Sequence, residues 1–191
     1  VNEEGKWAII SDYIEGETLA EKMEKDPENV EKYMKEFVEI QLEIHDKTAP
    51  LLNKMKDKMS VRINSLKAVN ATTRYELSTR LESMPKHKKV LHGDFNPTNV
   101  VIDKEGKYYI LDWSHATQGN ASADAATTYL LLTLQDPKLA EMYMNMFCDM
   151  SDTAKQYVQR WLPIVAASRL TKAIPEEKDL LEKWLDVVEY E

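Results

Sequence analysis

Glycine and cysteine are scarce in this sequence, and each shortage excludes a class of structure. Only five of the 191 residues are glycine, at positions 5, 16, 93, 106 and 119, and no two lie close enough to form a glycine-rich loop around a phosphate. The single cysteine, Cys148, excludes an internal disulfide and favours a reducing compartment. The cytoplasm is therefore the expected location.

Long apolar runs and an excess of basic residues are also absent. No apolar run approaches the roughly 20 residues of a membrane span, and the N-terminus lacks the layout of a signal peptide, so we expect no membrane association. Lysine and arginine number 25 against 33 acidic residues, which gives a formal net charge of −8. This charge argues against broad nucleic-acid binding. It is compatible with a cationic ligand, although solubility alone explains it.

Most of the chain has the apolar spacing of helices, with steps of three and four residues. Thr18 and Glu21 form a capping-box pattern that predicts the start of the first helix. A second, clearly amphipathic helix is predicted after Pro27. Further helices are expected over residues 51–66, 73–84, 122–134 and 137–147, over 152–172 with a bend at Pro163, and from Pro175 onward. The length fits one domain with a substantial core.

Short β-branched and aromatic runs predict strands in the middle of the chain, at residues 90–91, 100–102 and 108–111. Residues 103–106 lie between the last two runs and are predicted to form a hairpin loop. Near the N-terminus, residues 7–14 predict another short strand, apolar enough to be buried. The predicted fold class is α+β and mostly helical, with a small central β-hairpin insert.

Three polar residues stand on this predicted hairpin frame: Asp94, Asn99 and Asp112. If the loop is 103–106, Asn99 faces Ile110, and Asp112 lies one same-face step beyond. The two side chains would then be about 7–8 Å apart at the backbone. Carboxylate and amide oxygens at that separation can converge on one Mg²⁺ ion. A slip of one residue in the register would place them on opposite faces.

The same three residues fit the requirements of phosphoryl transfer. That reaction needs metal ions to neutralise phosphate oxygens and a carboxylate to accept the proton of the attacking hydroxyl. Asp94 is the candidate base, five residues before Asn99, and Asp112 is the candidate metal ligand. The protein-kinase pattern His-Arg-Asp-x-x-x-x-Asn, followed by Asp-Phe-Gly, has the same interval. Each residue alone could be an ordinary turn residue, but their order on this frame favours the catalytic interpretation.

At this point a family resemblance is plain. Residues 92–99, His-Gly-Asp-Phe-Asn-Pro-Thr-Asn, and residues 110–113, Ile-Leu-Asp-Trp, resemble the signature of the aminoglycoside phosphotransferase and choline kinase superfamily. These enzymes are similar in fold to protein kinases. Residues 13–19 resemble the hinge of this superfamily, and residues 40–45 resemble its Leu-x-x-Leu-His helix end. Residues 119–124 resemble its Gly-Asp-Pro-x-x-Asp stretch, with two departures in the middle.

The resemblance implies ATP-dependent transfer of phosphate to a hydroxyl of a small molecule. It implies Asp94 as the catalytic base, with Asn99 and Asp112 as ligands of Mg²⁺. His92 would pack beneath the loop as a structural residue, and Asp124 would be a buried support that accepts hydrogen bonds from the loop. The backbone of three hinge residues would meet the adenine: Asp12, Tyr13 and Ile14.

The superfamily also has an N-terminal lobe with a phosphate-covering loop, a strand lysine and a helix glutamate, and no segment here matches these parts. We therefore expect residues 1–15 to be the hinge and last strand of an absent N-terminal lobe, and residues 16–191 to be a protein-kinase-like C-terminal catalytic lobe. Such a lobe alone would bind ATP–Mg weakly and transfer phosphate poorly. The uncovered strand near residues 8–10 would be prone to self-association.

Two other interpretations stay open. A metal-dependent hydrolase could be built on His92, Asp94, Asp112 and His115, whose residue types suit a transition metal. A non-catalytic binding or pseudokinase module is the other. The sequence encoded upstream of Val1 would distinguish this module from an enzyme, because a glycine-rich loop and a strand lysine favour the enzyme.

The acceptor molecule cannot be identified from the sequence. Members of the superfamily phosphorylate aminoglycosides, choline, homoserine and sugars, and their acceptor sites lie in the variable helical part. Tyr143, Trp161 and Trp184 could line such a pocket, although aromatic residues at helical spacing are more often core.

Overall fold

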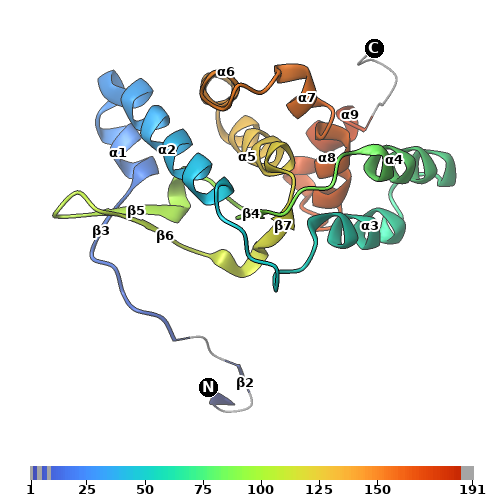
Figure 1. Ribbon diagram of the computed structural model, residues 1–191, viewed down its shortest axis with the longest axis horizontal. Coiled ribbons are helices and arrows are strands. Elements are labelled where there is room, and N and C mark those ends of the chain that lie inside the picture. Colours follow the sequence, from blue (N-terminus) through green and yellow to red (C-terminus); the bar gives the residue numbers. More distant parts are fainter. Residues whose placement is uncertain (1, 4–5, 8–9, 186–191) are drawn as a thin grey trace.

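Helices account for most of the computed structural model, which describes residues 2–3, 6–7 and 10–185 (Figure 1). The α-helices are α1 Leu19–Lys25, α2 Val30–His45, α3 Met55–Ser65, α4 Ala71–Ser83, α5 Ala121–Gln135, α6 Pro137–Ser151, α7 Lys155–Gln159, α8 Leu162–Leu170 and α9 Lys178–Lys183. Four 3-10 turns are η1 Pro27–Asn29, η2 Pro97–Asn99, η3 Trp113–His115 and η4 Pro175–Glu177. Within the described part of the chain, no helix is both long and apolar enough to cross a membrane.

In the described part of the chain, seven short strands form three small antiparallel sheets. The strands are β1 Asn2–Glu3, β2 Lys6–Trp7, β3 Gly16–Thr18, β4 Lys89–Leu91, β5 Val100–Asp103, β6 Tyr108–Ile110 and β7 Thr117–Gly119. β1 pairs with β2, β5 lies between β3 and β6, and β4 pairs with β7. The predicted class, α+β and mostly helical with a central hairpin, is confirmed.

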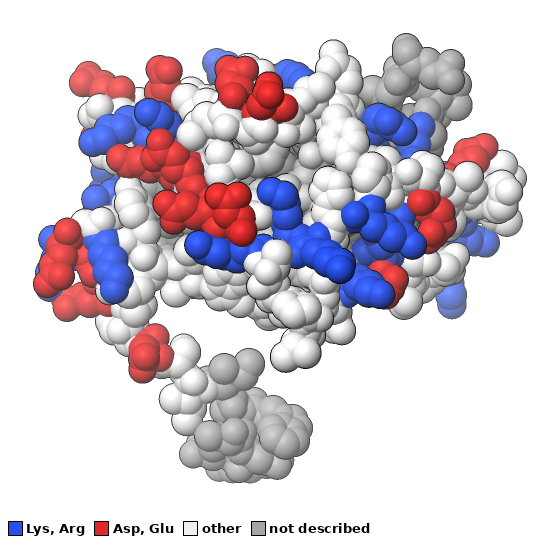
Figure 2. Space-filling model, viewed as in Figure 1, with Lys and Arg blue, Asp and Glu red and all other residues white. Residues whose placement is uncertain are grey.

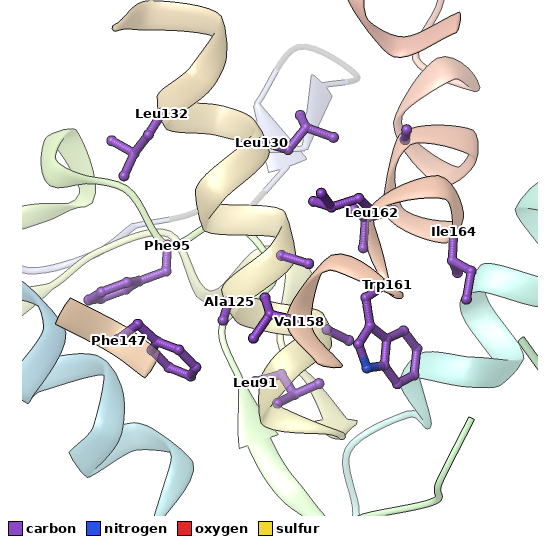
Figure 3. Packing of buried hydrophobic residues seen from close by; sticks show 14 of the residues in the cluster. Leu91, Phe95, Ala125, Leu130, Leu132, Phe147, Val158, Trp161, Leu162 and Ile164 are labelled. Atoms are coloured by element: carbon purple, nitrogen blue, oxygen red, sulfur yellow. The ribbon is translucent and has the colours of Figure 1, made fainter. Parts of the chain in front are cut away.

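The helices enclose one core around α5, which packs against α6 and α8. Figure 3 shows Leu91 of β4, Phe95 of the following loop, Phe147 of α6 and Leu162 of α8 around this helix. All four side chains are buried. In Figure 1, α1 and α2 lie over the β3–β5–β6 sheet, and α3 and α4 lie at the opposite end. The two strands β4 and β7 lie between these ends, so the loops that follow them are held at the centre of the molecule.

The predicted helix starts are mostly confirmed, with one clear exception. Thr18 and Glu21 form the expected capping box, with the Glu21 N–H donating to Thr18 Oγ1 at 3.1 Å. The single bent helix predicted over residues 152–172 is wrong, because α7 ends at Gln159 and α8 begins at Leu162. Pro163 lies in the first turn of α8, where its missing N–H costs nothing.

The predicted buried strand over residues 7–14 is wrong from residue 10 onward, although Trp7 ends the short strand β2. Residues 10–15 form no regular structure, and the side chains of Ile10 and Tyr13 are 79% and 89% exposed. No strand within the described ranges lies beside this segment, so its backbone has no partner and its apolar side chains have no cover. Residues 8 and 9, part of the strand that was expected to promote self-association, lie outside the described residues.

The hairpin register differs from the prediction by one residue. Val100 pairs with Ile110 and Ile102 pairs with Tyr108, because Asp103 belongs to the ladder and its N–H donates to the Lys107 carbonyl at 3.0 Å. The loop is therefore residues 104–106, with Gly106 at a φ of 83°. Three-residue hairpin loops commonly place glycine in this left-handed position.

The aromatic residues considered for an acceptor pocket belong mainly to the core. Tyr143 and Trp161 are completely buried, and Trp184 is partly buried and stacks on Tyr129 with ring centroids 5.9 Å apart. These three side chains therefore stabilise the helical packing.

Candidate active site

The loop after β4 carries Asp94 and is fixed to the core by its neighbour Phe95. The Phe95 ring is completely buried and stacks on Phe37 of α2, with centroids 4.3 Å apart. The hydroxyl of Thr128, on α5, donates to the Phe95 carbonyl at 2.9 Å. Two helices thus hold the residue beside Asp94, whose own side chain is half-buried at the surface.

The start of the same loop is held by the buried carboxylate of Asp124, on α5. Its Oδ1 accepts the Gly93 N–H at 2.8 Å, and its Oδ2 accepts the His92 N–H at 3.2 Å. From α2, His45 Nε2 lies 3.0 Å from Oδ2, and Gln41 Nε2 lies 3.4 Å from it. Asp124 therefore ties α2, α5 and the loop together.

Burial and hydrogen bonding act on Asp124 in opposite directions. Burial alone would raise the pKa of its carboxyl, since it disfavours the charged form. The hydrogen bond and charge of His45, together with the Gly93 N–H, outweigh this effect and hold the pKa below its ordinary value. Asp124 is therefore an ionised acceptor, surrounded by donors.

His92 uses both ring nitrogens inside the protein. Its Nδ1 accepts the Asp94 N–H at 3.3 Å, which leaves Nε2 to donate to the Leu111 carbonyl at 2.8 Å. The imidazole is completely buried. His92 consequently connects the Asp94 loop to the segment just before Asp112, and neither nitrogen is free for a metal or for proton transfer.

The amide of Asn99 joins the second candidate residue to the first. Asn99 Nδ2 donates to the Asp94 carbonyl at 2.9 Å, and Asn96 Nδ2 donates to the same oxygen at 3.0 Å. With its nitrogen used in this way, the Asn99 Oδ1 oxygen is left as an acceptor. The backbone of Asp94 is therefore clamped from two sides, while Asn99 presents the kind of oxygen that Mg²⁺ binds.

Asp112 stands where the chain leaves β6, in a left-handed conformation with φ 55°. It caps the η3 turn, its Oδ1 accepting the Ser114 N–H at 3.4 Å, and its side chain is exposed. Hydrogen bonding by Ser114 lowers the pKa of Asp112, although slight burial opposes this, and His115 and His92 lower it further. Asp112 is thus an exposed, ionised carboxylate.

The observed strand register shows that Asn99 and Asp112 are not brought together by sharing a face of the hairpin, as predicted. Continuing the observed pairing places Asn99 opposite Leu111, whose N–H donates to the Asn99 carbonyl at 2.8 Å. Asp112 lies past the end of β6, and its left-handed backbone, rather than the alternation of a strand, directs its side chain. The donor set, an amide oxygen and an ionised carboxylate, suits Mg²⁺.

Gly93 allows a close approach that no other residue could make. Its φ is 79°, and a Cβ atom there would lie 2.6 Å from the His115 carbonyl oxygen. The left-handed backbone alone costs a non-glycine residue about 1–2 kcal/mol, and the backbone clash adds to it. We therefore expect Gly93→Ala to lower the free energy of unfolding by about 2 kcal/mol or more, as measured by urea denaturation.

Gly106→Ala is the matched comparison for Gly93→Ala. Gly106 has a similar φ of 83°, but a Cβ there would meet nothing within 4 Å. Gly106→Ala should therefore lower the free energy of unfolding only by the cost of the left-handed backbone, about 1–2 kcal/mol. Equal destabilisation by the two variants would show that the contact with His115 is unimportant.

The remaining predicted residues are separate from this cluster. Asp12 and Tyr13 are exposed and Ile14 is partly buried, all on the irregular segment before β3. The hydrolase alternative finds no support: among the described residues, no group of three or more His, Cys, Asp or Glu is arranged to hold a metal ion. His92 cannot serve as a metal ligand because both of its ring nitrogens already hydrogen-bond within the protein.

Two groups of residues around the site escaped the sequence analysis. One is the buried pair Gln41 and His45, noted only as part of a helix-end motif. The other is a set of four cationic side chains around a pocket beside Gly93: Lys58, Arg62, Arg169 and Lys172. Their spacing, i and i+4 on α3 and i and i+3 at the end of α8, was the only available signal.

Charge is unevenly spread over the surface despite the acidic total. On the face in Figure 2, acidic side chains are most numerous over α1 and α2, and basic side chains form a band across the middle. The net charge of −8 therefore does not indicate the sign of any particular pocket.

Comparison with known proteins identifies the family. The sequence pattern of the phosphotransferase enzyme family matches residues 2–161. The chain belongs to this family. No curated protein sequence matches it in the corresponding comparison. The family membership confirms the resemblance drawn from the motifs at residues 92–99 and 110–113.

Solved structures show which fold this phosphotransferase-family chain has. It is similar to choline kinase LicA from Streptococcus pneumoniae, with a TM-score of 0.64 at 16% identity, over 91% of this chain and 68% of that one. It is also similar to a thermostable mutant of aminoglycoside phosphotransferase APH(4)-Ia in complex with AMP-PNP and hygromycin B, with a TM-score of 0.63 at 15% identity, over 91% and 66%. A third is a choline/ethanolamine kinase family protein from Mesorhizobium loti, with a TM-score of 0.56 at 14% identity, over 91% and 64%.

Identities of 14–16% establish a shared fold rather than a shared substrate. Family and fold together support phosphotransfer at a general level and the chemistry of a small-molecule kinase.

Proposed function

We propose that this chain transfers the terminal phosphate of ATP to a hydroxyl group of a small molecule, with Asp94 as the general base and Asn99 and Asp112 as Mg²⁺ ligands. The observation that carries the proposal is the hydrogen-bonded connection among these residues. Asn99 binds the Asp94 carbonyl, and His92 bridges from the Asp94 N–H to the carbonyl just before Asp112. A base and two metal ligands held at fixed separation are what in-line phosphoryl transfer requires.

The reaction needs few groups from the protein. The acceptor oxygen attacks the terminal phosphorus, its proton passes to the Asp94 carboxylate, and the bond from that phosphorus to the bridging oxygen of ATP breaks to release ADP. Bound Mg²⁺ would neutralise the charge on the phosphate oxygens. Asp124 and His92 act as positioning residues, because their hydrogen bonds fix the backbone of residues 92–94.

The nucleotide would approach along the segment before β3. In this proposal residues 16–191 act as the catalytic lobe, and the backbone of Asp12, Tyr13 and Ile14 receives the adenine. Support comes from the relatives of known structure, among them LicA in complex with AMP and APH(4)-Ia in complex with AMP-PNP. Trp113 and Leu111, partly exposed on either side of Asp112, provide apolar surface beside the proposed metal site.

Phosphate transfer from labelled ATP to a panel of hydroxylated acceptors tests the proposal. It is measured on the 191-residue chain and on any longer product of its native reading frame, over a Mg²⁺ titration and with chelator. We expect transfer to require Mg²⁺. In Asp112→Asn, half-maximal transfer should need at least about 10–100-fold more Mg²⁺. Even residues that only support a metal ligand have effects of that size.

Asp149→Asn is the matched control for Asp112→Asn. Asp149 is exposed on α6, so this variant removes the same charge at a different place. Its Mg²⁺ dependence should equal that of the unaltered chain. Transfer that persists in chelator, or an unchanged Mg²⁺ dependence in Asp112→Asn, would contradict the assignment of the metal site.

A further inference from the structure

A small pocket opens beside Gly93, between α3 and α8, and its wall is unusually cationic. The cavity has a volume of about 60 Å³, enough for several water molecules or one compact ionic group. Lys58 and Arg62 reach it from α3, and Arg169 and Lys172 reach it from the end of α8. Its remaining wall includes Gly93 itself, the residue next to the proposed base.

Among the residues that the structure describes, Arg169 alone of the four cations has a carboxylate partner within ion-pair distance. Arg169 forms a two-pronged ion pair with Glu177, with Nε and Nη2 at 2.7 and 2.6 Å from the two carboxylate oxygens. Arg62 donates to the neutral hydroxyl of Ser168 at 3.1 Å, and Lys58 donates weakly to the His115 carbonyl at 3.4 Å. The ammonium group of Lys172 makes no hydrogen bond or ion pair within the described part of the chain, although its backbone N–H donates to the Arg169 carbonyl at 2.9 Å.

The cations consequently repel one another. Burial lowers the pKa of Lys58, and the charges of Arg62 and Lys172 lower it further. Burial and the charge of Arg169 lower the pKa of Lys172, an effect that Asp94 opposes. Burial, Lys172 and Lys58 also lower the pKa of His115, which favours its neutral form at pH 7. An anion in the pocket would relieve this repulsion.

The charges in and around the pocket do not balance. Three carboxylates, Glu177, Asp94 and the pocket-lining Asp124, stand against the four cations, which leaves one positive charge in excess. Asp94 would itself take up a proton during the proposed reaction, which would leave the pocket more positive. Once Asp94 is protonated, a group with two negative charges would restore neutrality, and a phosphate monoester carries nearly that charge at neutral pH.

We propose that the four cations bind an anionic group of the acceptor, a phosphate monoester in the first place, and so hold its hydroxyl beside Asp94. The inference rests on the proposed function for the identity of the ligand as an acceptor. It assigns Lys58, Arg62, Arg169 and Lys172 to substrate specificity. Arginine and lysine together suit phosphate oxygens, because arginine offers planar paired donors and lysine a compact charge. A purely cationic acceptor such as choline would be repelled from this pocket.

Calorimetric titration of the 191-residue chain with glycerol 3-phosphate tests the pocket without any need for turnover. Glycerol and choline are the comparison ligands, and AMP-PNP with Mg²⁺ is the competitor. We expect glycerol 3-phosphate to bind, glycerol to bind at least tenfold more weakly, and choline not to bind. Arg62→Ala and Lys172→Ala should each weaken binding about tenfold or more, since each removes a positive charge from the wall of the pocket.

Lys67→Ala is the matched control, because Lys67 is exposed just beyond α3. It should leave the affinity unchanged. Without ligand, the thermal unfolding midpoint of Lys172→Ala should equal or exceed that of the unaltered chain, because repulsion is relieved, so that weaker binding cannot be ascribed to misfolding.

Two outcomes would overturn the inference. If glycerol 3-phosphate binds no better than glycerol, the pocket takes no anion. If AMP-PNP with Mg²⁺ displaces glycerol 3-phosphate, the cations hold the phosphates of the nucleotide instead of the acceptor. If the chain binds the anion through Arg62 and Lys172 but never transfers phosphate, the anion site is upheld and only the proposed function is refuted.

Discussion

Replacing Asp94 with asparagine should lower the turnover of phosphate transfer by about 10²–10⁴-fold, the usual contribution of a positioned general base. Asparagine has nearly the same shape but cannot accept the proton of the attacking hydroxyl. The backbone carbonyl of residue 94, which Asn96 and Asn99 hold, is unaltered by the change. Steady-state kinetics should therefore show a fall in kcat with little change in the KM for ATP.

The control for this result is again Asp149→Asn, which should retain full turnover. The unfolding midpoint of Asp94→Asn should stay close to that of the unaltered chain, because no hydrogen bond to the Asp94 carboxylate exists among the described residues. Turnover within tenfold of the unaltered chain, with the same dependence on pH, would refute Asp94 as the base.

Replacing Asp124 with alanine should lower the free energy of unfolding by about 3–5 kcal/mol, as is typical when one member of a buried ionic group is removed. The change would leave the N–H groups of His92 and Gly93 and the ring of His45 without their acceptor. Asp124→Asn should also be costly, because its NH₂ group would face donors. Urea denaturation followed by circular dichroism measures both variants.

Thr133→Ala is the matched control on α5. Within the described residues, the Thr133 hydroxyl bonds only to the Tyr129 carbonyl one turn earlier, in a partly buried position, so its loss should cost less than about 1 kcal/mol. If Asp124→Ala were no more costly than this control, the buried network would not contribute to stability.

The contribution of Asp124 should also depend on pH with a definite sign. Its pKa is lower in the folded than in the unfolded chain, so acid favours the unfolded state, which binds more protons. The stability that it supplies is complete above the unfolded pKa of about 3.9 and is lost as the pH falls through the lower folded value. The stability difference between the unaltered chain and Asp124→Ala should therefore shrink in strong acid.

Local signals in the sequence predicted the elements of the site well and its geometry less well. The motif at residues 92–99 placed Asp94 on a loop after a strand and Asn99 at the start of the next strand. The structure has Asp94 on that loop and Asn99 in the η2 turn, one residue before β5. The hairpin register was wrong because the turn could begin after either Ile102 or Asp103. Two interactions settle it: Asp103 accepts the N–H groups of Glu105 and Lys107. Such a choice depends on side-chain hydrogen bonds that strand propensity does not report.

The cationic pocket could not be predicted because its halves are far apart in the sequence. Arg62 and its hydrogen-bond partner Ser168 are separated by 106 residues, and only the packing of α3 on α8 brings them together. The helical spacing of each basic pair marks a helix face but not its neighbour. The strand predicted near the N-terminus was wrong at residues 10–14 because of a missing neighbour. An apolar run becomes a buried strand only where a partner strand exists.

The network around Asp124 also implies an order of assembly. Asp124 bonds to His92 and Gly93, which precede it by 32 and 31 residues, and to His45, which precedes it by 79. During synthesis the Asp94 loop therefore leaves the ribosome well before the carboxylate that shapes it. Until α5 has docked on α2, the loop has the residues for the reaction but no acceptor for its backbone N–H groups. The nascent chain should thus acquire its site late, as one cooperative event in which α2, α5 and the loop come together.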